Sequence, residues 1–414
     1  MKRLAIRLSA GLGEALAVGH LAEHERRVYF EYDPSFARGG IELSPFKLPL
    51  RPGLVEHTDL RFGPLPGLFD DSLPDGWGLL LMDRAFRRRG LDPARVSALD
   101  RLSWLGTRTV GALTYHPPTA PHAGSEALDL FAAGQNAEEV LAGAVTDVLP
   151  ELERAGGSPG GARPKVLVGV MNDEVITGED DLPPGYVHWL IKLAARQDAV
   201  DAGPVEYGYA LMALAAGIVM PEVRLFEARS KGVVRRYFGV RRFDRPRGNE
   251  RLHVHTFGNL VHASFRLPST DYSELLKVTR LLTRNHKDVL RAFRLMVFNV
   301  GAHNRDDHAK NFAFLMAPGA TPSAPWEWSL SPAYDLTPSD GLGGEHMTSV
   351  YGEGRQPGRS QCLELARRSG IAQCEAIGVI DEVNAALARW PELGRQARCR
   401  QRTIREIAAR IRPV

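Results

Sequence analysis

The chain has 414 residues, of which 44% are hydrophobic and 24% are charged, so it carries ample apolar material for folded cores. Its length exceeds the usual limit for a single core, and two or three structural units are expected. The net charge of +3 at pH 7 permits an anionic ligand such as a nucleotide but does not establish nucleic-acid binding.

Three cysteines, Cys362, Cys374 and Cys399, lie near the end of the chain and show no Cys-x-x-Cys spacing. Structural zinc and a disulfide framework are therefore disfavoured, and a reducing compartment fits. No apolar run approaches the roughly 18 residues that span a bilayer. We expect a cytoplasmic chain without a membrane contact.

Residues 1–120 are expected to form a β-rich unit. Aromatic and β-branched runs at 27–32 and 111–115 predict strands, and Gly, Pro and Asp cluster between such runs. One helix is predicted at 77–89, where Pro74-Asp75-Gly76 marks its start and three arginines precede Gly90. Residues 117–124 are predicted to form a linker or a long loop.

Residues 125–245 are expected to form a small α/β unit. A helical segment at 137–154 leads into a Gly-rich loop at 156–165, and a strand at 166–170 follows directly. Further along, a strand at 188–193, a helix at 206–216 and a strand at 235–240 are predicted.

Residues 246–414 are expected to be mostly helical. Helices are predicted at 271–282, 287–300 and 370–411, with the region 304–335 interrupting them.

The Gly-rich loop follows a helix and lacks the Gly-Lys-Ser/Thr ending, so a P-loop NTPase is disfavoured. Protein kinases instead place a Lys on a later strand, and Lys192 within Trp189-Leu190-Ile191-Lys192-Leu193 is of that kind. Alternatively, Lys192 lies on an edge strand with its amine in solvent. Glu206 opens the next helix, where it either pairs with Lys192 or only stabilises the helix N-terminus.

Asp306 and Asn311 reproduce the Asp-x-x-x-x-Asn spacing of a kinase catalytic loop, in which Asp accepts the substrate hydroxyl proton and Asn binds Mg²⁺. Lys310 could offset charge on the transferring phosphoryl group. Asp335 follows at a distance similar to that of the second metal-binding Asp in kinases. A solvated charged turn is the alternative. His303 and His308 lack a third imidazole or thiolate, so His308 is interpreted as a structural or hydrogen-bonding residue.

Together these residues resemble the HipA family of serine/threonine kinases, the toxin components of bacterial toxin–antitoxin modules. The resemblance covers most of the chain and follows the family's order. The segments that carry it are Phe30-Glu31-Tyr32-Asp33, Leu43-Ser44-Pro45, Phe69-Asp70-Asp71-Ser72-Leu73-Pro74-Asp75-Gly76-Trp77-Gly78, Gly106…Gly111-Ala112-Leu113, Ser158-Pro159-Gly160-Gly161-Ala162-Arg163-Pro164-Lys165, Ile191-Lys192-Leu193, Arg242-Phe243-Asp244-Arg245, Asp306-Asp307-His308-Ala309-Lys310-Asn311-Phe312 and Tyr334-Asp335-Leu336.

The resemblance implies an α+β fold: a protein-kinase-like bilobal core with a small α/β lobe (125–245) and a helical C-terminal lobe (246–414), preceded by the β-rich subdomain (1–120). It implies Asp306 as the catalytic base assisted by Lys310, and Asn311 and Asp335 as Mg²⁺ ligands. It assigns ATP contacts to Lys192, Ser158, Gly160, Gly161, Ala162, Lys165, Arg242, Phe243, Asp244 and His308. The segment Arg242-Phe243-Asp244 would border the adenine, and Ser158 falls where the family carries its autophosphorylated serine. The alternative for Ser158 is a residue needed only for a turn. Asp307 stands beside Asp306 where several relatives have Gly, so the base is assigned by the spacing to Asn311.

The implied function is ATP- and Mg²⁺-dependent phosphorylation of a cytoplasmic protein, with an aminoacyl-tRNA synthetase as the candidate class. The implied partner is an antitoxin of HipB type, which would make most of any DNA contact. One alternative is a catalytically inactive kinase-like module that binds nucleotide or such a partner. Another is a small-molecule kinase on the same type of core.

Overall fold

The N-terminal part of the chain forms a five-stranded antiparallel sheet with the strand order β4-β3-β2-β1-β5. The strands are β1 (Lys2–Leu8), β2 (Leu16–His24), β3 (Arg27–Tyr32), β4 (Leu54–Glu56) and β5 (Leu113–His116). This computed structural model describes residues 1–11, 13–121, 124–143, 148–155, 160–178, 181–195, 200–319 and 324–414. The strands predicted at 27–32 and 111–115 are confirmed as β3 and β5.

Helices accompany this sheet to a greater extent than the sequence indicated. They are α1 (Pro34–Gly39), α2 (Gly67–Asp70), α3 (Gly76–Arg88) and α4 (Ala98–Leu105), with a short 3₁₀ helix at Pro93–Arg95. The helix predicted at 77–89 is α3. The other helices were missed because each is too short to show a sustained helical period, although Ser97 and Asp100 form a capping box at α4.

The middle of the chain forms a second antiparallel sheet, with the order β7-β6-β8-β10-β9. Its elements are α5 (Leu130–Leu141), α6 (Pro150–Ala155), β6 (Lys165–Met171), β7 (Glu174–Thr177), β8 (Val187–Lys192), α7 (Ala202–Ala215), β9 (Val223–Ser230) and β10 (Val233–Arg241). The predicted strands and the helix α7 are confirmed. The single helical segment predicted at 137–154 was wrong, because two separate helices, α5 and α6, occupy this part of the chain.

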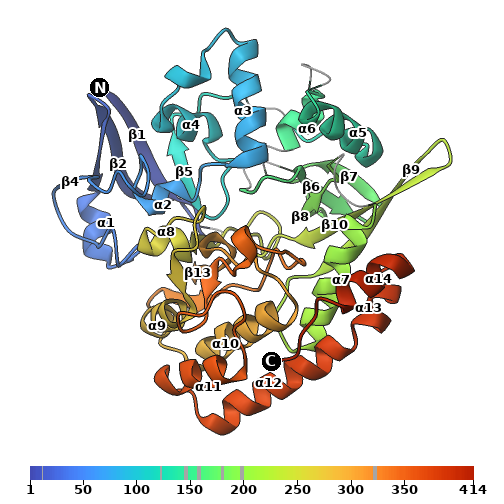
Figure 1. Cartoon of the computed structure of the whole chain (residues 1–414). Coiled ribbons are helices and arrows are strands. Elements are labelled where there is room, and N and C mark those ends of the chain that lie inside the picture. The colour runs from blue at the N-terminus through green and yellow to red at the C-terminus, as the bar shows by residue number, and fades with distance from the viewer. Residues whose placement is uncertain are drawn as a thin grey trace.

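Helix α3 belongs to the N-terminal part by sequence but packs on the second sheet (Figure 1). Trp77 and Leu81 of α3 are buried in one cluster with Ala133, Val166 and Ile191. The N-terminal and middle parts therefore share a hydrophobic core.

The last part of the chain is mostly helical and also contains a small sheet, β11-β13-β14. Its elements are β11 (His253–Thr256), α8 (Phe257–Val261), β12 (Thr270–Asp271), α9 (Tyr272–Thr283), α10 (His286–Gly301), the 3₁₀ helix Ala309–Asn311, β13 (Ala313–Ala317), β14 (Glu327–Leu330), the 3₁₀ helix Leu342–Gly344, β15 (Thr348–Ser349), α11 (Arg359–Arg368), α12 (Gln373–Ala388), α13 (Trp390–Gln396) and α14 (Gln401–Ala408). The helices predicted at 271–282 and 287–300 are α9 and α10, whereas the region 370–411 is divided into α12, α13 and α14.

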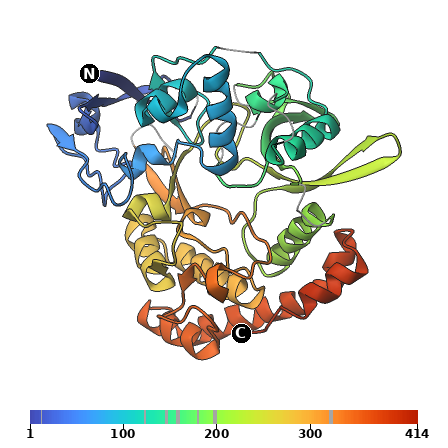
Figure 2. The same ribbon diagram turned by 45° about the horizontal axis from the view of Figure 1, so that its top comes forward.

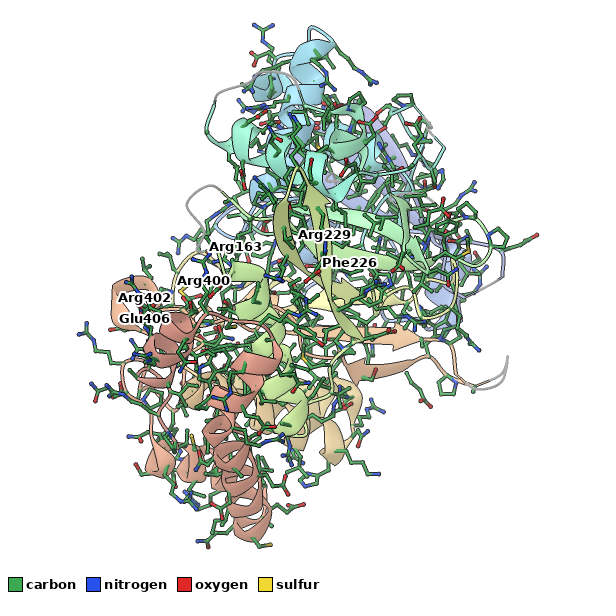
Figure 3. All side chains as sticks on the ribbon, turned by 90° about the vertical axis from the view of Figure 1, so that its right-hand side faces the viewer. Arg163, Phe226, Arg229, Arg400, Arg402 and Glu406 are labelled. Carbon is green, nitrogen blue, oxygen red and sulfur yellow. The ribbon has the colours of Figure 1, made fainter. Side chains whose placement is uncertain are left out.

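The largest hydrophobic cluster joins α7 to these helices and includes Tyr209, Phe293, Phe298 and Trp390. Figure 2 shows α7 in green between the second sheet and the red C-terminal helices. The C-terminal end is also tied to the start of α7, because the backbone N–H of Arg400 donates to Asp201 at 2.7 Å. Figure 3 labels Arg400 near the C-terminal helix that carries Arg402 and Glu406. Within the described ranges, every helix is too short or too polar to span a bilayer.

Candidate active site

A buried lysine between two carboxylates forms the charged centre of the candidate site. Lys192 ends β8, which lies between β6 and β10, and its amine contacts Glu206 of α7 and lies 2.5 Å from Asp335 Oδ1. The predicted pairing of Lys192 with Glu206 is confirmed. The alternative of an edge strand with a solvated amine is wrong, since β8 is internal and the Lys192 side chain is only 13% exposed.

The charges within this centre shift one another's pKa values. Burial alone would lower the pKa of Lys192, but the carboxylates of Asp335 and Glu206 outweigh it and raise that pKa. Burial opposes ionisation of Asp335 as well, yet Lys192 and Lys165 hold the pKa of Asp335 below its ordinary value. For Glu206, burial dominates and the pKa is raised. The centre is therefore a coupled group of charges rather than a surface ion pair.

A second lysine borders the same centre from the Gly-rich loop. Lys165 begins β6, pairs in register with Lys192, and is 6% exposed. Its amine donates to the carbonyl of Gly160, and burial together with the charge of Lys192 lowers its pKa. Gly161 has a φ of +102°, a backbone conformation that other residues rarely adopt, so the loop favours glycine at this position.

The other predicted residues of the Gly-rich loop are partly within the described residues. Gly160 and Ala162 are exposed, as is Arg163, whose positive charge acts on both Asp306 and Glu206. Ser158, the predicted autophosphorylation site, lies outside the described residues.

Asp306 and Asp307 have opposite environments. Asp306 is exposed, and among the described residues its carboxylate makes no hydrogen bond or salt bridge. Partial desolvation and the nearby carboxylates of Asp335 and Asp307 raise the pKa of Asp306, against the opposing effect of His308. The Asp306 carboxylate is therefore accessible from solvent.

The Asp307 carboxylate, in contrast, is 1% exposed and fully engaged. It accepts hydrogen bonds from Tyr272 Oη at 2.7 Å and from the Met347 N–H at 2.9 Å, and it lies 2.9 Å from His346 Nδ1. Such a carboxylate supports the loop and is not accessible to a substrate.

The other members of the predicted catalytic loop lie around Asp306. Asn311 Nδ2 donates to the Asp306 carbonyl at 2.8 Å, which leaves the amide oxygen of Asn311 for another partner. His308 acts electrostatically on both Asp306 and Asp335, and its Nδ1 is buried without a hydrogen-bond partner in the described structure. Lys310 turns toward the N-terminal part, with its amine 3.2 Å from Asp70 Oδ2 and 4.6 Å from the centre of the Phe265 ring.

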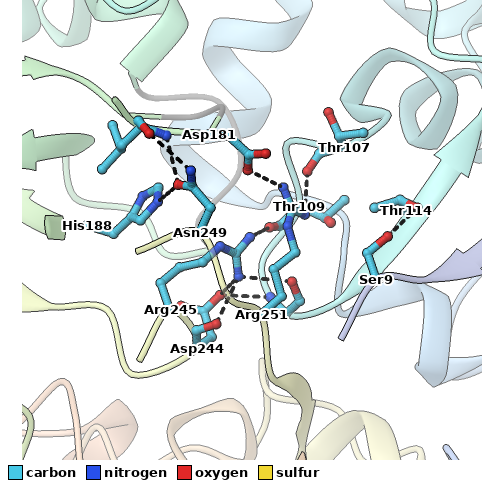
Figure 4. A network of polar contacts seen from close by, with 12 residues as sticks. Ser9, Thr107, Thr109, Thr114, Asp181, His188, Asp244, Arg245, Asn249 and Arg251 are labelled. Carbon is cyan, nitrogen blue, oxygen red and sulfur yellow. Dashed lines mark hydrogen bonds and ion pairs between the residues drawn. The ribbon is translucent and has the colours of Figure 1, made fainter. Parts of the chain in front are cut away.

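Asp244, one of the predicted hinge residues, lies with Arg245 in a buried polar network (Figure 4). Asp244 receives two hydrogen bonds from Arg242, at 2.9 and 2.7 Å, and a third from the Gly111 N–H at 2.9 Å. Arg245 donates to the carbonyls of Gly111 and Thr109, both at 3.0 Å. The Arg242 and Asp244 side chains are thus bound to each other, and Asp244 and Arg245 bind the N-terminal part.

Phe243 differs from its two neighbours. It is only partly buried, and its ring centroid lies 5.6 Å from that of Tyr334, the residue before Asp335. Phe243 therefore packs against the residue that precedes Asp335 of the charged centre.

The donor chemistry of Asn311 and Asp335 fits Mg²⁺, which takes one or two carboxylate or amide oxygens together with substrate phosphates and water. Asp335 has a left-handed backbone with φ +58°, which is uncommon for a residue other than glycine. No group of three or more His, Cys, Asp or Glu within the described ranges could hold a metal by itself.

Two acidic residues at this site were quoted in the sequence but were given no role there. Asp70 contacts Lys310, and Asp75 accepts from the backbone N–H of Gly161. Both contacts join segments that are far apart in the chain, so neither spacing nor periodicity could indicate them.

Family models and a solved structure resemble this chain over most of its length. The HipA-like C-terminal domain matches residues 157–390, and the HipA N-terminal domain matches residues 12–116. The solved HipA of Shewanella oneidensis MR-1, in complex with HipB and operator DNA, aligns with a TM-score of 0.69 at 16% identity. That alignment covers 99% of this chain and 94% of that one. The Helicobacter pylori proinflammatory kinase CtkA aligns with a TM-score of only 0.33 at 11% identity, over 54% of this chain and 88% of its own. A search of curated proteins found no match.

Proposed function

The chain belongs to the HipA family, and we propose that it is an ATP- and Mg²⁺-dependent serine/threonine protein kinase with a bilobal kinase-like core. The observation that carries this proposal is the buried Lys192, bound by Glu206 and Asp335, next to a loop with an accessible Asp306. Phosphoryl transfer needs this set: a lysine for the phosphates, a carboxylate for the metal and a second carboxylate for the attacking hydroxyl.

In this proposal Lys192 and Lys165 contact the phosphates of ATP. Both amines are buried near the Gly-rich loop, where the low dielectric strengthens their attraction to an anion. Asp335 and Asn311 would hold Mg²⁺, which would offset the negative charge on the phosphoryl group during its transfer. Phe243 lies against the adenine.

Asp306 accepts the proton of the substrate hydroxyl. Its raised pKa makes the ionised carboxylate a stronger base than an ordinary aspartate, which favours proton acceptance in the transition state. The hydrogen bond from Asn311 Nδ2 to the Asp306 carbonyl fixes the backbone from which this carboxylate projects. Asp307 only supports this loop.

The substrate proposed for this chain is a serine or threonine on a cytoplasmic protein, with an aminoacyl-tRNA synthetase as the candidate class. Autophosphorylation on Ser158 belongs to the same proposal. The Shewanella HipA was solved together with HipB and operator DNA, which supports an antitoxin partner of HipB type for this chain.

Titration with Mg-ATP, followed by measurement of ADP release and of the mass of the intact protein, tests the proposed activity. We expect nucleotide binding, ADP release and a gain of one phosphate mass on the wild-type chain or on an added protein substrate. Nucleotide binding without turnover would contradict the kinase proposal and favour a kinase-like binding module.

A further inference from the structure

The connection between α2 and α3 of the N-terminal part passes along the candidate active site. We call residues 70–77 the acidic connection. Asp70 ends α2 and Asp75 precedes α3, so only four residues separate two carboxylates that face different loops of the kinase-like core.

Asp75 and Trp77 make hydrogen bonds to the Gly-rich loop. The Asp75 carboxylate accepts from the Gly161 N–H, and the Trp77 N–H donates to the Gly161 carbonyl at 3.1 Å. The Trp77 indole N–H donates to the Lys165 carbonyl at 3.1 Å. The loop is therefore hydrogen-bonded at both of its described ends, although Asp75 caps no backbone N–H of its own helix.

Gly76 allows this approach. Its φ is +43°, and a Cβ at this position would lie 2.6 Å from Ala162 Cα and from the Gly161 carbonyl oxygen. The backbone of the acidic connection and the backbone of the loop are therefore in direct contact, and only glycine fits at position 76.

Asp70 holds the other loop. Its Oδ2 lies 3.2 Å from the Lys310 amine and 3.1 Å from Asn259 Nδ2, which comes from α8. A Cβ on Gly67 would collide with the Asn259 carbonyl, so α2 and α8 also pack backbone to backbone. Asp70 is thus fixed relative to the core and fixes Lys310 in turn.

We infer that the acidic connection sets the position of the Gly-rich loop relative to the catalytic loop, with Asp75 acting on Gly161 and Asp70 acting on Lys310. Both aspartates are positioning residues. The N-terminal part would then contribute positioning residues to the active site. The kinetic consequences rest on the proposed kinase function, whereas the structural coupling does not.

Amide hydrogen exchange on the unliganded full chain tests the coupling directly. Asp75→Ala should increase exchange in residues 160–165 by about tenfold, since losing a charge-assisted hydrogen bond costs roughly that much in local stability. Asp75→Asn keeps an acceptor oxygen for Gly161 and should restore most of the protection. Asp70→Ala should increase exchange in residues 305–311 and leave residues 160–165 unchanged.

Asp83→Ala is the matched control. Asp83 lies on α3 and pairs with Arg101 at 2.6 Å, so this variant removes a comparable half-buried salt bridge that stays within the N-terminal part. It should leave exchange in both loops at the wild-type level. Unchanged exchange of residues 160–165 in Asp75→Ala, or an equal increase in Asp83→Ala, would overturn the inference.

Steady-state kinetics then separate the two roles. Asp75→Ala should raise KM for ATP about tenfold with kcat nearly unchanged, and Asp70→Ala should lower kcat about tenfold with KM nearly unchanged. Equal losses in every variant, including Asp83→Ala, would indicate general destabilisation and contradict the inference. A wild-type chain without phosphoryl transfer would overturn the proposed function, and the exchange data would still decide on the coupling.

Discussion

Asp306 and Asp307 are adjacent in the chain, but only Asp306 presents its carboxylate to solvent, while Asp307 is 1% exposed and bound by Tyr272, His346 and Met347. From the sequence alone, the two aspartates differ as candidate bases only in their spacing to Asn311. Their surroundings assign them different tasks, one in the proposed chemistry and one in the architecture of the loop.

Asp307→Ala should destabilise the folded chain by about 3 kcal/mol, because it leaves several buried donors without an acceptor. Urea unfolding measures this loss. Asp306→Asn, one position away, is the control. It should lower the free energy of unfolding by no more than about 0.5 kcal/mol, and an increase is compatible with the account. Equal losses for the two variants would contradict the division of roles.

The raised pKa of Asp306 gives a pH dependence with a defined sign. The folded chain binds this proton more tightly than the unfolded chain, so stability is lost as the pH rises from the ordinary Asp value through the raised pKa. Asp306→Asn should therefore gain stability over wild type at pH 7, and this gain should disappear near pH 3, which lies below the ordinary aspartate pKa of about 3.9. Unfolding measured from pH 3 to pH 7 tests this, and a gain that is largest at low pH would contradict it.

Lys192 and Glu206 should be strongly coupled. Lys192→Met leaves the carboxylates of Glu206 and Asp335 without their counter-charge, and we expect a loss of about 3–5 kcal/mol. Glu206→Gln in the Lys192→Met background should recover part of that loss. A double-mutant cycle measures the coupling, and additive effects would show that the buried contact has little energetic weight.

The pairing of Lys192 with Glu206 could be predicted from the sequence because the patterns that indicate it are local. An apolar strand carrying Lys192 and a helix opening at Glu206 are each visible as short patterns, and the sheet then brings them together. The position of Asp307 inside a network with Tyr272 and His346 depends on α9 and on the segment after Asp335. Its burial therefore has no local signal.

The same reason explains the errors in the fold. Strands β13 and β14 of the small sheet were missed because strands such as Glu327–Leu330 are short and lie in a stretch dominated by loop residues. The division of 137–154 into α5 and α6 was missed because both helices are rich in the same helix-forming residues. Contacts such as Asp70 with Lys310 arise only when separate units pack.

Gly76→Ala should weaken nucleotide binding through a steric effect. The added Cβ would meet Ala162 and Gly161 of the Gly-rich loop, and we expect at least a tenfold lower affinity for Mg-ADP, about 1.4 kcal/mol. Gly90→Ala is the control, because Gly90 also has a positive φ but a Cβ there meets open space. Calorimetric titration of both variants separates backbone strain from contact with the loop, and an equal loss of affinity would exclude the steric effect.

The most direct measurement is the transfer of labelled γ-phosphate from ATP by wild type and by Asp306→Asn, each shown to be folded and to bind Mg-ADP equally. We predict transfer by wild type and a loss of at least about 10²-fold in rate for Asp306→Asn, as expected when a general base is removed. Transfer at the wild-type rate by Asp306→Asn would contradict Asp306 as the base, and no transfer by wild type would contradict the kinase function itself.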